Sequence, residues 1–374
     1  MNTRASRLTS LGLVALLTAC GGGGGASPSP APSPGPPQPP VTIDISQPWA
    51  TAQPVEEHMD GVKLARATND ASAIPRFRSL LVARHGKLVL EDYFGGATAS
   101  TAFDVRSVTK SVLSLLVGDA VAAGKISLDT TVGDYFGAPY VLDAGDRAVN
   151  VRQLLTMTSR YQWNENTGDD YNLWALSTDH VQFLFDRAQN DAAGTFTYNS
   201  AAVSLLGNLL QRAVGEPLPQ YANEQLFTPL GITAVNWEEL EPGMVNAGSG
   251  IQLAARDLLR VGQLFLQRGQ SGTLQIAPAA WIDDASKPKF AWRDTYGAQA
   301  STSYGYLWWV ADSPAIPVAF AWGYGGQFIY VVPSLDMVVV ATTNWQGVSA
   351  ETDPGTFATR ILTIIVSDVV TSAN

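Results

Sequence analysis

Short apolar runs with the composition of β-strands lie near both ends of the chain. Residues 79–84 and 87–93 are two such runs, and only His85 and Gly86 stand between them. Two strand-like runs joined by a two-residue turn that contains glycine predict a β-hairpin. Three more runs of this kind lie towards the C-terminus, at residues 304–310, 327–332 and 337–343.

Helical periodicity dominates the middle of the chain and returns at its C-terminal end. Residues 151–157, 201–212 and 255–266 carry apolar side chains at helical spacing. Near the end, Asp353 and Pro354 have the order of an N-cap and a first-turn proline. The helix that they predict has an apolar stripe formed by Phe357, Ile361, Leu362, Ile365 and Val369.

The order of strands, helices and strands predicts an α/β (α+β) fold with two lobes. Strands from both ends are expected to form one antiparallel sheet with flanking helices, and roughly residues 125–290 are expected to form a helical lobe. Both lobes belong to one domain, residues 48–374, which is long enough to bury a large core. A cleft between two lobes is a usual place for a ligand site.

The first 47 residues have the composition of an exported and tethered protein. A positively charged start, an apolar run from Leu11 to Leu17 and small residues before Cys20 describe a secretory signal over residues 1–19. The ending Leu-Thr-Ala-Cys resembles the lipobox of bacterial lipoproteins. That resemblance implies lipidation of Cys20 and anchoring in the bacterial cell envelope, at the periplasmic face of the outer membrane. Residues 20–47 are expected to form a tether rich in glycine, proline and serine. Plain secretion is the alternative.

Charge and the supply of ligand side chains limit the possible partners. The net charge is −10 and no basic cluster is present, so we expect no nucleic-acid partner. Cys20 is the only cysteine, which excludes an internal disulfide. The three histidines, His58, His85 and His180, are scattered along the chain. We therefore expect neither a metal site nor a cofactor.

Ser107 and Lys110 stand at the head of the apolar run 111–123 and carry the strongest chemical signal. Three residues apart, they share one helical turn. A partly desolvated lysine has a lowered pKa and can take the proton of a serine nucleophile. A serine that opens a helix also offers its backbone N–H to a developing oxyanion. The same spacing recurs at Ser286 and Lys289, where an internal proline favours a surface turn. The alternative for Ser107 is an ordinary N-cap with a solvent-facing lysine.

Two further segments can complete a site around Ser107. Tyr198 stands at a loop-to-helix junction, where a nearby lysine ammonium is expected to lower the pKa of its phenol. Packing at the start of the helix is the alternative. For Tyr221, a second candidate tyrosine, packing is the interpretation that we prefer. The glycine-rich segment 323–326 permits close backbone approach of a ligand. The N–H of Tyr324 is the candidate second oxyanion donor, with a glycine-rich hairpin as the alternative.

In this order, the segments that contain Ser107, Tyr198 and Tyr324 resemble those of the serine β-lactamase and penicillin-binding-protein superfamily. The resemblance covers nearly all of residues 75–370. It is closest to the class C-like branch, which includes family VIII carboxylesterases, D-aminopeptidase-type enzymes and 6-aminohexanoate-dimer hydrolases. It implies a β-lactamase/transpeptidase-like fold, acylation of Ser107 and an oxyanion hole formed by the N–H groups of Ser107 and Tyr324. It also implies that Lys110 tunes the nucleophile and that Tyr198 is the base that later protonates the leaving group.

The chain departs from the pattern of this superfamily near the candidate site. Ser200 stands where the tyrosine motif usually has asparagine, Ala321 where lysine or histidine is usual, and Arg160 where glycine is common. The first two changes remove an amide contact and a cation that could hold a carboxylate. They favour a carboxylesterase or amidase that acts on small neutral or amphipathic acyl substrates.

The remaining substrate contacts follow from the resemblance and from the aromatic content. Ser200, Trp322 and Gly323 occupy positions at which the superfamily contacts substrate. Trp163 and Trp174 are candidates for lining the acyl pocket. Core packing of these two tryptophans is the alternative, because aromatic side chains in a helical lobe usually belong to the core.

Other functions remain open on the sequence. A β-lactamase or a D-Ala-D-Ala carboxypeptidase uses the same nucleophile. A non-catalytic envelope lipoprotein that uses the fold for binding is a further alternative, although retention of Ser107, Lys110 and Tyr198 argues against it. An α/β-hydrolase is disfavoured, because no G-x-S-x-G is present and its triad needs a histidine later in the chain than His180.

Overall fold

The computed structural model describes residues 42–373, except for 166, 190–193, 314–315 and 347–353. The predicted signal peptide, Cys20, most of the predicted tether and Asp353 lie outside the described residues. Within the described part, no helix is both long enough and apolar enough to cross a membrane.

The first described residues pack on the folded domain. The backbone N–H of Ile43 donates to Oε1 of Gln267 over 2.9 Å, and that of Ile45 donates to Oγ of Ser271 over 2.8 Å. The Ile45 side chain is 1% exposed. The predicted end of the tether at residue 47 is therefore wrong, because this segment buries apolar surface and belongs to the domain.

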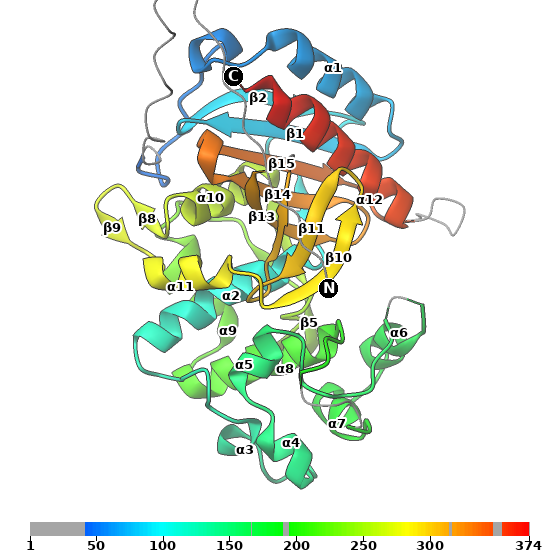
Figure 1. Cartoon of the computed structure of the whole chain (residues 1–374). Helices are drawn as coiled ribbons and strands as arrows, with labels where there is room; N and C mark the ends of the chain where they lie inside the picture. Colours follow the sequence, from blue (N-terminus) through cyan, green and yellow to red (C-terminus); the bar gives the residue numbers. More distant parts are fainter. Residues whose placement is uncertain (1–41, 166, 190–193, 314–315, 347–353, 374) are drawn as a thin grey trace, which may run out of the picture. The chain divides into compact units, whose positions relative to one another are not determined.

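An eight-stranded antiparallel sheet forms the centre of the domain, in the order β10-β11-β12-β13-β14-β15-β1-β2 (Figure 1). Leu81 in β1 lies opposite Val340 in β15, and Val340 lies opposite Ile329 in β14. The prediction that strands from both ends of the chain share one sheet is confirmed. The strands are β1 (Phe77–Arg84), β2 (Lys87–Tyr93), β10 (Phe290–Tyr296), β11 (Gln299–Tyr304), β12 (Trp309–Asp312), β13 (Pro317–Gly323), β14 (Gln327–Val332) and β15 (Met337–Thr343).

The predicted hairpin between β1 and β2 is confirmed. His85 and Gly86 both have positive φ, 49° and 73°, as a two-residue type I′ turn requires. Because glycine tolerates this conformation without steric cost, Gly86 explains why the turn forms at this point of the chain.

The run 304–310, which we predicted as one strand, is divided between two. β11 ends at Tyr304 and β12 begins at Trp309. In the loop between them, the carbonyl of Leu307 accepts a hydrogen bond of 2.7 Å from Oγ of Ser111. This carbonyl bonds a helix instead of a neighbouring strand, so the ladder is interrupted here.

Helices pack on both faces of the sheet. In Figure 1, α12 (Pro354–Thr363) crosses one face and α10 (Ala255–Leu266) lies behind the strands. A Cβ at Gly262 in α10 would lie 2.5 Å from the Val338 side chain of β15, so this helix packs closely on the sheet. Our helical lobe, which reached residue 290, is therefore too long. The predicted stripe near the C-terminus is confirmed by the burial of Phe357, Ile361, Leu362, Ile365 and Val369.

The helical lobe follows α2 (Val108–Ala122), which lies between the two lobes. Its helices are α3 (Val132–Tyr135), α4 (Ala144–Ala148), α5 (Val151–Leu155), α6 (Asp170–Ala175), α7 (His180–Phe185), α8 (Ser200–Val214) and α9 (Leu218–Ala222), which runs into a π-helix (Asn223–Phe227). The remaining α-helices and strands of the described residues are α1 (Gly61–Ser72), α11 (Ala279–Ala285), β3 (Ala102–Asp104), β4 (Asn236–Trp237), β5 (Glu239–Glu241), β6 (Met244–Val245), β7 (Ile251–Ala254), β8 (Gln270–Ser271) and β9 (Leu274–Gln275), and a π-helix (Ile364–Val369) continues α12.

Candidate active site

Ser107 lies between a strand and the first turn of α2. The short strand β3 pairs with β7, with Phe103 opposite Leu253. The chain then passes through Arg106, whose φ of 49° is unusual for a residue other than glycine. Ser107 is the N-cap of α2, but its side chain does not cap the helix. Its hydroxyl is therefore left for another partner.

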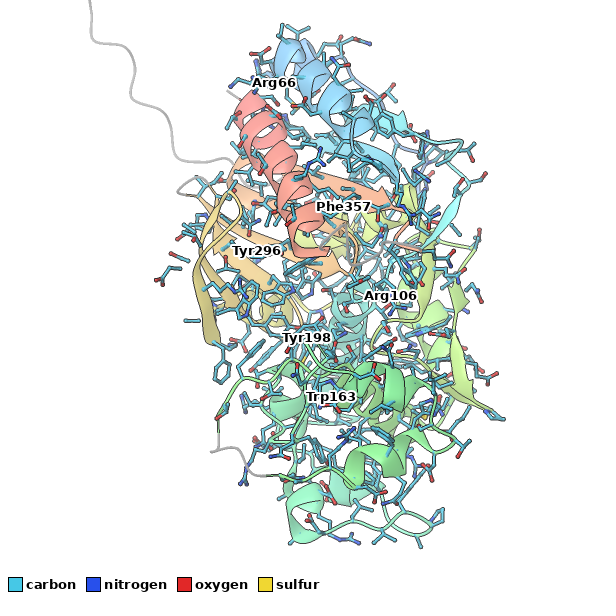
Figure 2. All side chains as sticks on the ribbon, turned by 90° about the vertical axis from the view of Figure 1, so that its right-hand side faces the viewer. Arg66, Arg106, Trp163, Tyr198, Tyr296 and Phe357 are labelled. Carbon is cyan, nitrogen blue, oxygen red and sulfur yellow. The ribbon has the colours of Figure 1, made fainter. Side chains whose placement is uncertain are left out.

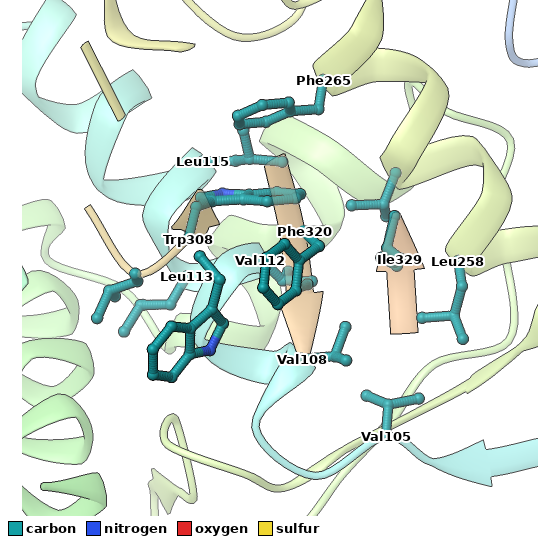
Figure 3. Packing of buried hydrophobic residues seen from close by; sticks show 14 of the residues in the cluster. Val105, Val108, Val112, Leu113, Leu115, Leu258, Phe265, Trp308, Phe320 and Ile329 are labelled. Carbon is teal, nitrogen blue, oxygen red and sulfur yellow. The ribbon is translucent and has the colours of Figure 1, made fainter. Parts of the chain in front are cut away.

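The helix that carries Ser107 is buried on nearly all sides. Figure 3 shows Val108, Val112 and Leu115 of α2 packed in a core with Phe320 of β13 and Phe265 of α10. All five are at most 4% exposed. A nucleophile mounted on a core helix has little freedom to move, which favours a fixed catalytic geometry.

Lys110 is the most buried charged group beside the nucleophile, with 1% of its surface exposed. Its Nζ lies 2.9 Å from Oγ of Ser107, 2.8 Å from Oγ of Ser200 and 2.7 Å from the carbonyl oxygen of Gly248. Burial lowers the pKa of Lys110 from its ordinary 10.5 to about 7, against the attraction of the Glu165 carboxylate. At neutral pH, a large fraction of Lys110 is therefore an amine, which can act as a base.

Tyr198 lies directly before α8, where the side chain of Asn199 accepts a hydrogen bond from the N–H of Ala202 and caps the helix. The Nζ of Lys110 lies 4.9 Å from the centroid of the Tyr198 ring. This ring also stacks on Trp309, with centroids 6.1 Å apart. Figure 2 shows Tyr198 between the strands and the green helices of the helical lobe.

Our expectation that the pKa of Tyr198 falls is wrong. Burial raises the pKa of this phenol well above its ordinary 10.0, and the charge of Glu165 adds to the rise. A hydrogen bond with Ser107 acts in the opposite direction but is outweighed. Tyr198 is therefore a neutral phenol, which can donate a proton, while Lys110 is the group that titrates near neutrality.

The end of β13 lies against the chain just before the nucleophile. A Cβ at Gly323 would lie 2.2 Å from the carbonyl oxygen of Val105, so only glycine permits this approach. Tyr324 follows, with 45% of its surface exposed. Among the described residues, neither its N–H nor that of Ser107 has a hydrogen-bond acceptor. Two unpaired N–H groups on adjoining segments are what an oxyanion hole requires.

Most of the residues that we predicted to contact substrate are buried. Ser200 is 1% exposed and bonds Lys110, and Trp163 is 8% exposed. Trp174 is fully buried and donates to the carbonyl of His180 over 3.1 Å, so our assignment of it to the acyl pocket is wrong. It fills the core of the helical lobe. Gly323 is buried, and Trp322 is partly exposed.

Aromatic side chains gather on the sheet beside Tyr198. Trp309 contacts Trp292 and Trp322, with centroid distances of 4.8 and 5.6 Å. Trp322 also packs on Tyr296, at 4.9 Å. Since Trp292 and Trp322 are partly exposed, they offer an apolar surface near the nucleophile. These side chains come from the three strands β10, β12 and β13, and it is the pairing of the strands through β11 that brings them together, so the sequence alone did not indicate this cluster.

Sequence reasoning also missed two charged side chains near Lys110. Glu165 accepts hydrogen bonds from Ser200, and its negative charge acts on Lys110. The guanidinium carbon of Arg106 lies 4.5 Å from the centroid of the Trp345 ring and 5.4 Å from that of Tyr171. The position of Arg106 next to Ser107 was the only signal available for either residue.

Tyr221 and the Ser286–Lys289 sequence have structural roles, as we expected. Tyr221 is 5% exposed and donates a hydrogen bond of 2.5 Å to Asp119. Ser286 follows α11 and donates to the carbonyl of Ile282, while Lys289 pairs with Asp284. Across the described residues, no group of three or more histidine, cysteine, aspartate or glutamate side chains is placed to hold a metal ion.

Comparison with curated proteins finds distant enzymes. The chain is 24% identical over 289 residues to a 6-aminohexanoate-dimer hydrolase of Paenarthrobacter ureafaciens. The aligned region covers 71% of this chain and 72% of that protein. It is 26% identical over 234 residues to the esterase EstB of Burkholderia gladioli, covering 56% of this chain and 59% of that protein.

The fold and the family agree with these similarities. The structure of EstCE1, a hydrolase with promiscuous acyltransferase activity, superposes with a TM-score of 0.68 at 19% identity, covering 83% of this chain and all of that one. This likeness supports the β-lactamase/transpeptidase-like fold. The β-lactamase family model matches residues 72–360, a region that includes Ser107, Lys110 and Tyr198. On this match, the chain belongs to the β-lactamase family of serine hydrolases.

Proposed function

We propose that this protein is a carboxylesterase or amidase that forms an acyl-enzyme on Ser107 and acts on small acyl substrates. One observation carries the proposal: a lysine amine with a pKa of about 7 lies 2.9 Å from the hydroxyl of Ser107. A base of this pKa takes a proton efficiently at neutral pH. A lysine with only a structural role would gain nothing from such a costly burial.

Acylation follows from the contacts of Ser107. The Lys110 amine takes the Oγ proton while an Oγ electron pair forms a bond to the acyl carbon. The carbonyl π electrons move to oxygen, where the N–H groups of Ser107 and Tyr324 donate hydrogen bonds to it. When the carbonyl re-forms, the bond to the leaving group breaks. Tyr198 protonates that group and regains a proton from the Lys110 ammonium.

Deacylation uses the same groups with water as the nucleophile. The Lys110 amine takes a proton from water as the water oxygen bonds to the acyl carbon. The second intermediate collapses with cleavage of the bond to Oγ, and Ser107 receives the proton from Lys110. The acid product leaves, and both Lys110 and Tyr198 return to their neutral forms.

The surroundings of the nucleophile favour an apolar acyl or leaving group. Trp322 and Trp292 are partly exposed beside Tyr198, and Ala321, which is fully buried, supplies no cation. The named activities of the relatives, a 6-aminohexanoate-dimer hydrolase and an esterase, support the same substrate class. A β-lactamase or D-Ala-D-Ala carboxypeptidase is the competing function.

We also propose that the protein is anchored in the bacterial cell envelope through a lipid on Cys20. The support is the sequence, in which the single cysteine ends an apolar signal. An anchor followed by a glycine- and proline-rich segment would hold the enzyme close to the membrane while it acts on soluble substrates.

Labelling with a fluorophosphonate, followed by mass spectrometry of the tryptic peptides, tests the central proposal. The adduct is expected on Ser107 with a stoichiometry near one. No adduct, or an adduct on another serine such as Ser286, would refute it.

A further inference from the structure

Glu165 uses both of its carboxylate oxygens near Lys110. Its Oε1 accepts a hydrogen bond of 2.7 Å from Oγ of Ser200. Its Oε2 accepts from the backbone N–H of Ser200 and from Nε1 of Trp163, each over 2.7 Å. These three bonds hold one carboxylate against the start of α8, although Glu165 itself lies on a loop.

The carboxylate determines the direction of the hydrogen bond between Ser200 and Lys110. An ionised carboxylate only accepts, and a hydroxyl has a single proton to donate. Since that proton goes to Glu165, Oγ of Ser200 must accept from Lys110. The carbonyl of Gly248 also only accepts. Two N–H bonds of Lys110 are thus assigned.

A neutral lysine amine has two N–H bonds and one lone pair. With the N–H bonds directed at Ser200 and Gly248, the lone pair faces the third neighbour, Oγ of Ser107 at 2.9 Å. We infer that Glu165 is a positioning residue that acts through Ser200 to aim the Lys110 lone pair at Ser107. The inference rests on the proposed function. It also changes the expected role of Ser200, from contacting substrate to orienting the base.

Three charged or titratable groups face Lys110. Glu165 favours its ammonium form, Arg106 on the turn before α2 disfavours it, and the ring of Tyr198 lies 4.9 Å from Nζ. Neutralising Glu165 removes the only one of these groups that is negatively charged. The pKa of Lys110 is then expected to fall.

Glu165→Gln tests the direction of these bonds. The amide oxygen is best placed at Oε2, where two fixed N–H groups donate, which leaves the amide NH₂ facing Ser200. The Ser200 hydroxyl then accepts from the amide and turns its own proton to the Lys110 lone pair. The lone pair of Lys110 then accepts the Ser200 proton and is no longer free for Ser107, although the substitution exchanges only one oxygen atom for an NH₂ group.

The rate of fluorophosphonate labelling of Ser107, measured against pH on the full chain, is the readout. For Glu165→Gln, we expect the plateau rate to fall by about tenfold or more and the midpoint to move to lower pH. Glu165→Asp keeps the charge and should recover part of the loss. In a Ser200→Ala background, Glu165→Gln should lower the plateau rate almost no further, since the hydroxyl that it turns is gone, while the midpoint still moves to lower pH because the charge of Glu165 is lost.

Glu241→Gln is a matched control. Its carboxylate also accepts from a backbone N–H, that of His180, and from the imidazole Nδ1, but it is not among the groups that act on Lys110. We expect its labelling profile to match that of the wild type. Thermal melting of each variant shows whether a loss reflects unfolding.

The outcomes separate the two proposals. If the wild type is not labelled on Ser107, the proposed function fails. If the wild type is labelled but Glu165→Gln keeps its plateau and midpoint, only the role of Glu165 is refuted. Additive losses from Glu165→Gln and Ser200→Ala, without a shift of the midpoint, would also overturn the inference, because they indicate a merely structural contact.

Discussion

The α-carbon of Gly323 and the carbonyl oxygen of Val105 are so close that an added Cβ would lie 2.2 Å from that oxygen. The contact joins the end of β13 to the segment just before Ser107. Because the obstructing atom belongs to the backbone, it cannot move aside as a flexible side chain would. The residues that follow on the two segments, Tyr324 and Ser107, carry the two candidate oxyanion donors.

Gly323→Ala should therefore reduce catalysis more than it reduces stability. The strand must move away from Val105, which separates the N–H of Tyr324 from that of Ser107. Loss of one oxyanion donor typically costs about 10²–10³ in kcat, and we expect a loss in this range for ester hydrolysis. Gly61→Ala is the control, since a Cβ there meets nothing within 4 Å. Equal activity of the two variants would contradict the assignment.

Ser107→Ala should abolish both ester hydrolysis and fluorophosphonate labelling. The reason is chemical, because alanine has no atom that can form the acyl bond. Ser286→Ala, at the second S-x-x-K sequence, should leave both unchanged, since that hydroxyl donates to the backbone carbonyls of Ile282 and Asp283 at the end of a helix. Labelling that persists in Ser107→Ala would show that the nucleophile lies elsewhere.

The activity should rise with pH through a midpoint near the pKa of Lys110, about 7. Only the amine form accepts the Ser107 proton, so kcat/KM is expected to fall tenfold per pH unit well below this value. Burial raises the pKa of Tyr198 above its ordinary 10.0, so no alkaline loss is expected below that pH. A midpoint near about 4, typical of a carboxylate, would exclude Lys110 as the base.

The sequence predicted the sheet and the proximity of Ser107 to Lys110 well, because both depend on local patterns. Ser107 and Lys110 share one helical turn, and the strand runs have the composition of buried strands. Residues brought together by tertiary packing were not predictable in this way. Glu165 reaches Lys110 only through Ser200, and the carbonyl of Gly248 has no side chain to mark it.

The mistaken predictions have the same origin. The pKa of Tyr198 was inferred from one neighbouring charge, whereas the burial that dominates it depends on the whole fold. Trp174 was assigned to a pocket because it is aromatic, but α6 turns it into the core. Composition indicates that a side chain is apolar and does not indicate which surface it covers.

Cys20→Ala should release the protein from the membrane fraction. The reason is that lipidation adds acyl chains whose burial in the bilayer holds the protein, and alanine has no thiol to carry them. Fractionation of cells that express each variant, with and without globomycin, is the measurement. Equal membrane association of the variant and the wild type would refute the lipid anchor but leave the proposed catalytic site unaffected.

A substrate panel is expected to give short esters first, linear amides next, and β-lactams and D-Ala-D-Ala peptides last. Ala321 cannot hold the carboxylate of the last two classes, and the Ser200 hydroxyl, which is engaged with Lys110 and Glu165, cannot replace an asparagine contact. Each missing hydrogen bond is worth about 1–3 kcal/mol, or roughly one to two decades in kcat/KM. Esters need neither contact, and their leaving groups demand less acid assistance from Tyr198. The measurement is kcat/KM for nitrophenyl butyrate, an aminohexanoate amide, a cephalosporin and a D-Ala-D-Ala peptide, with Ser107→Ala as the blank. A cephalosporin that is hydrolysed faster than nitrophenyl butyrate would contradict this order and favour a β-lactamase.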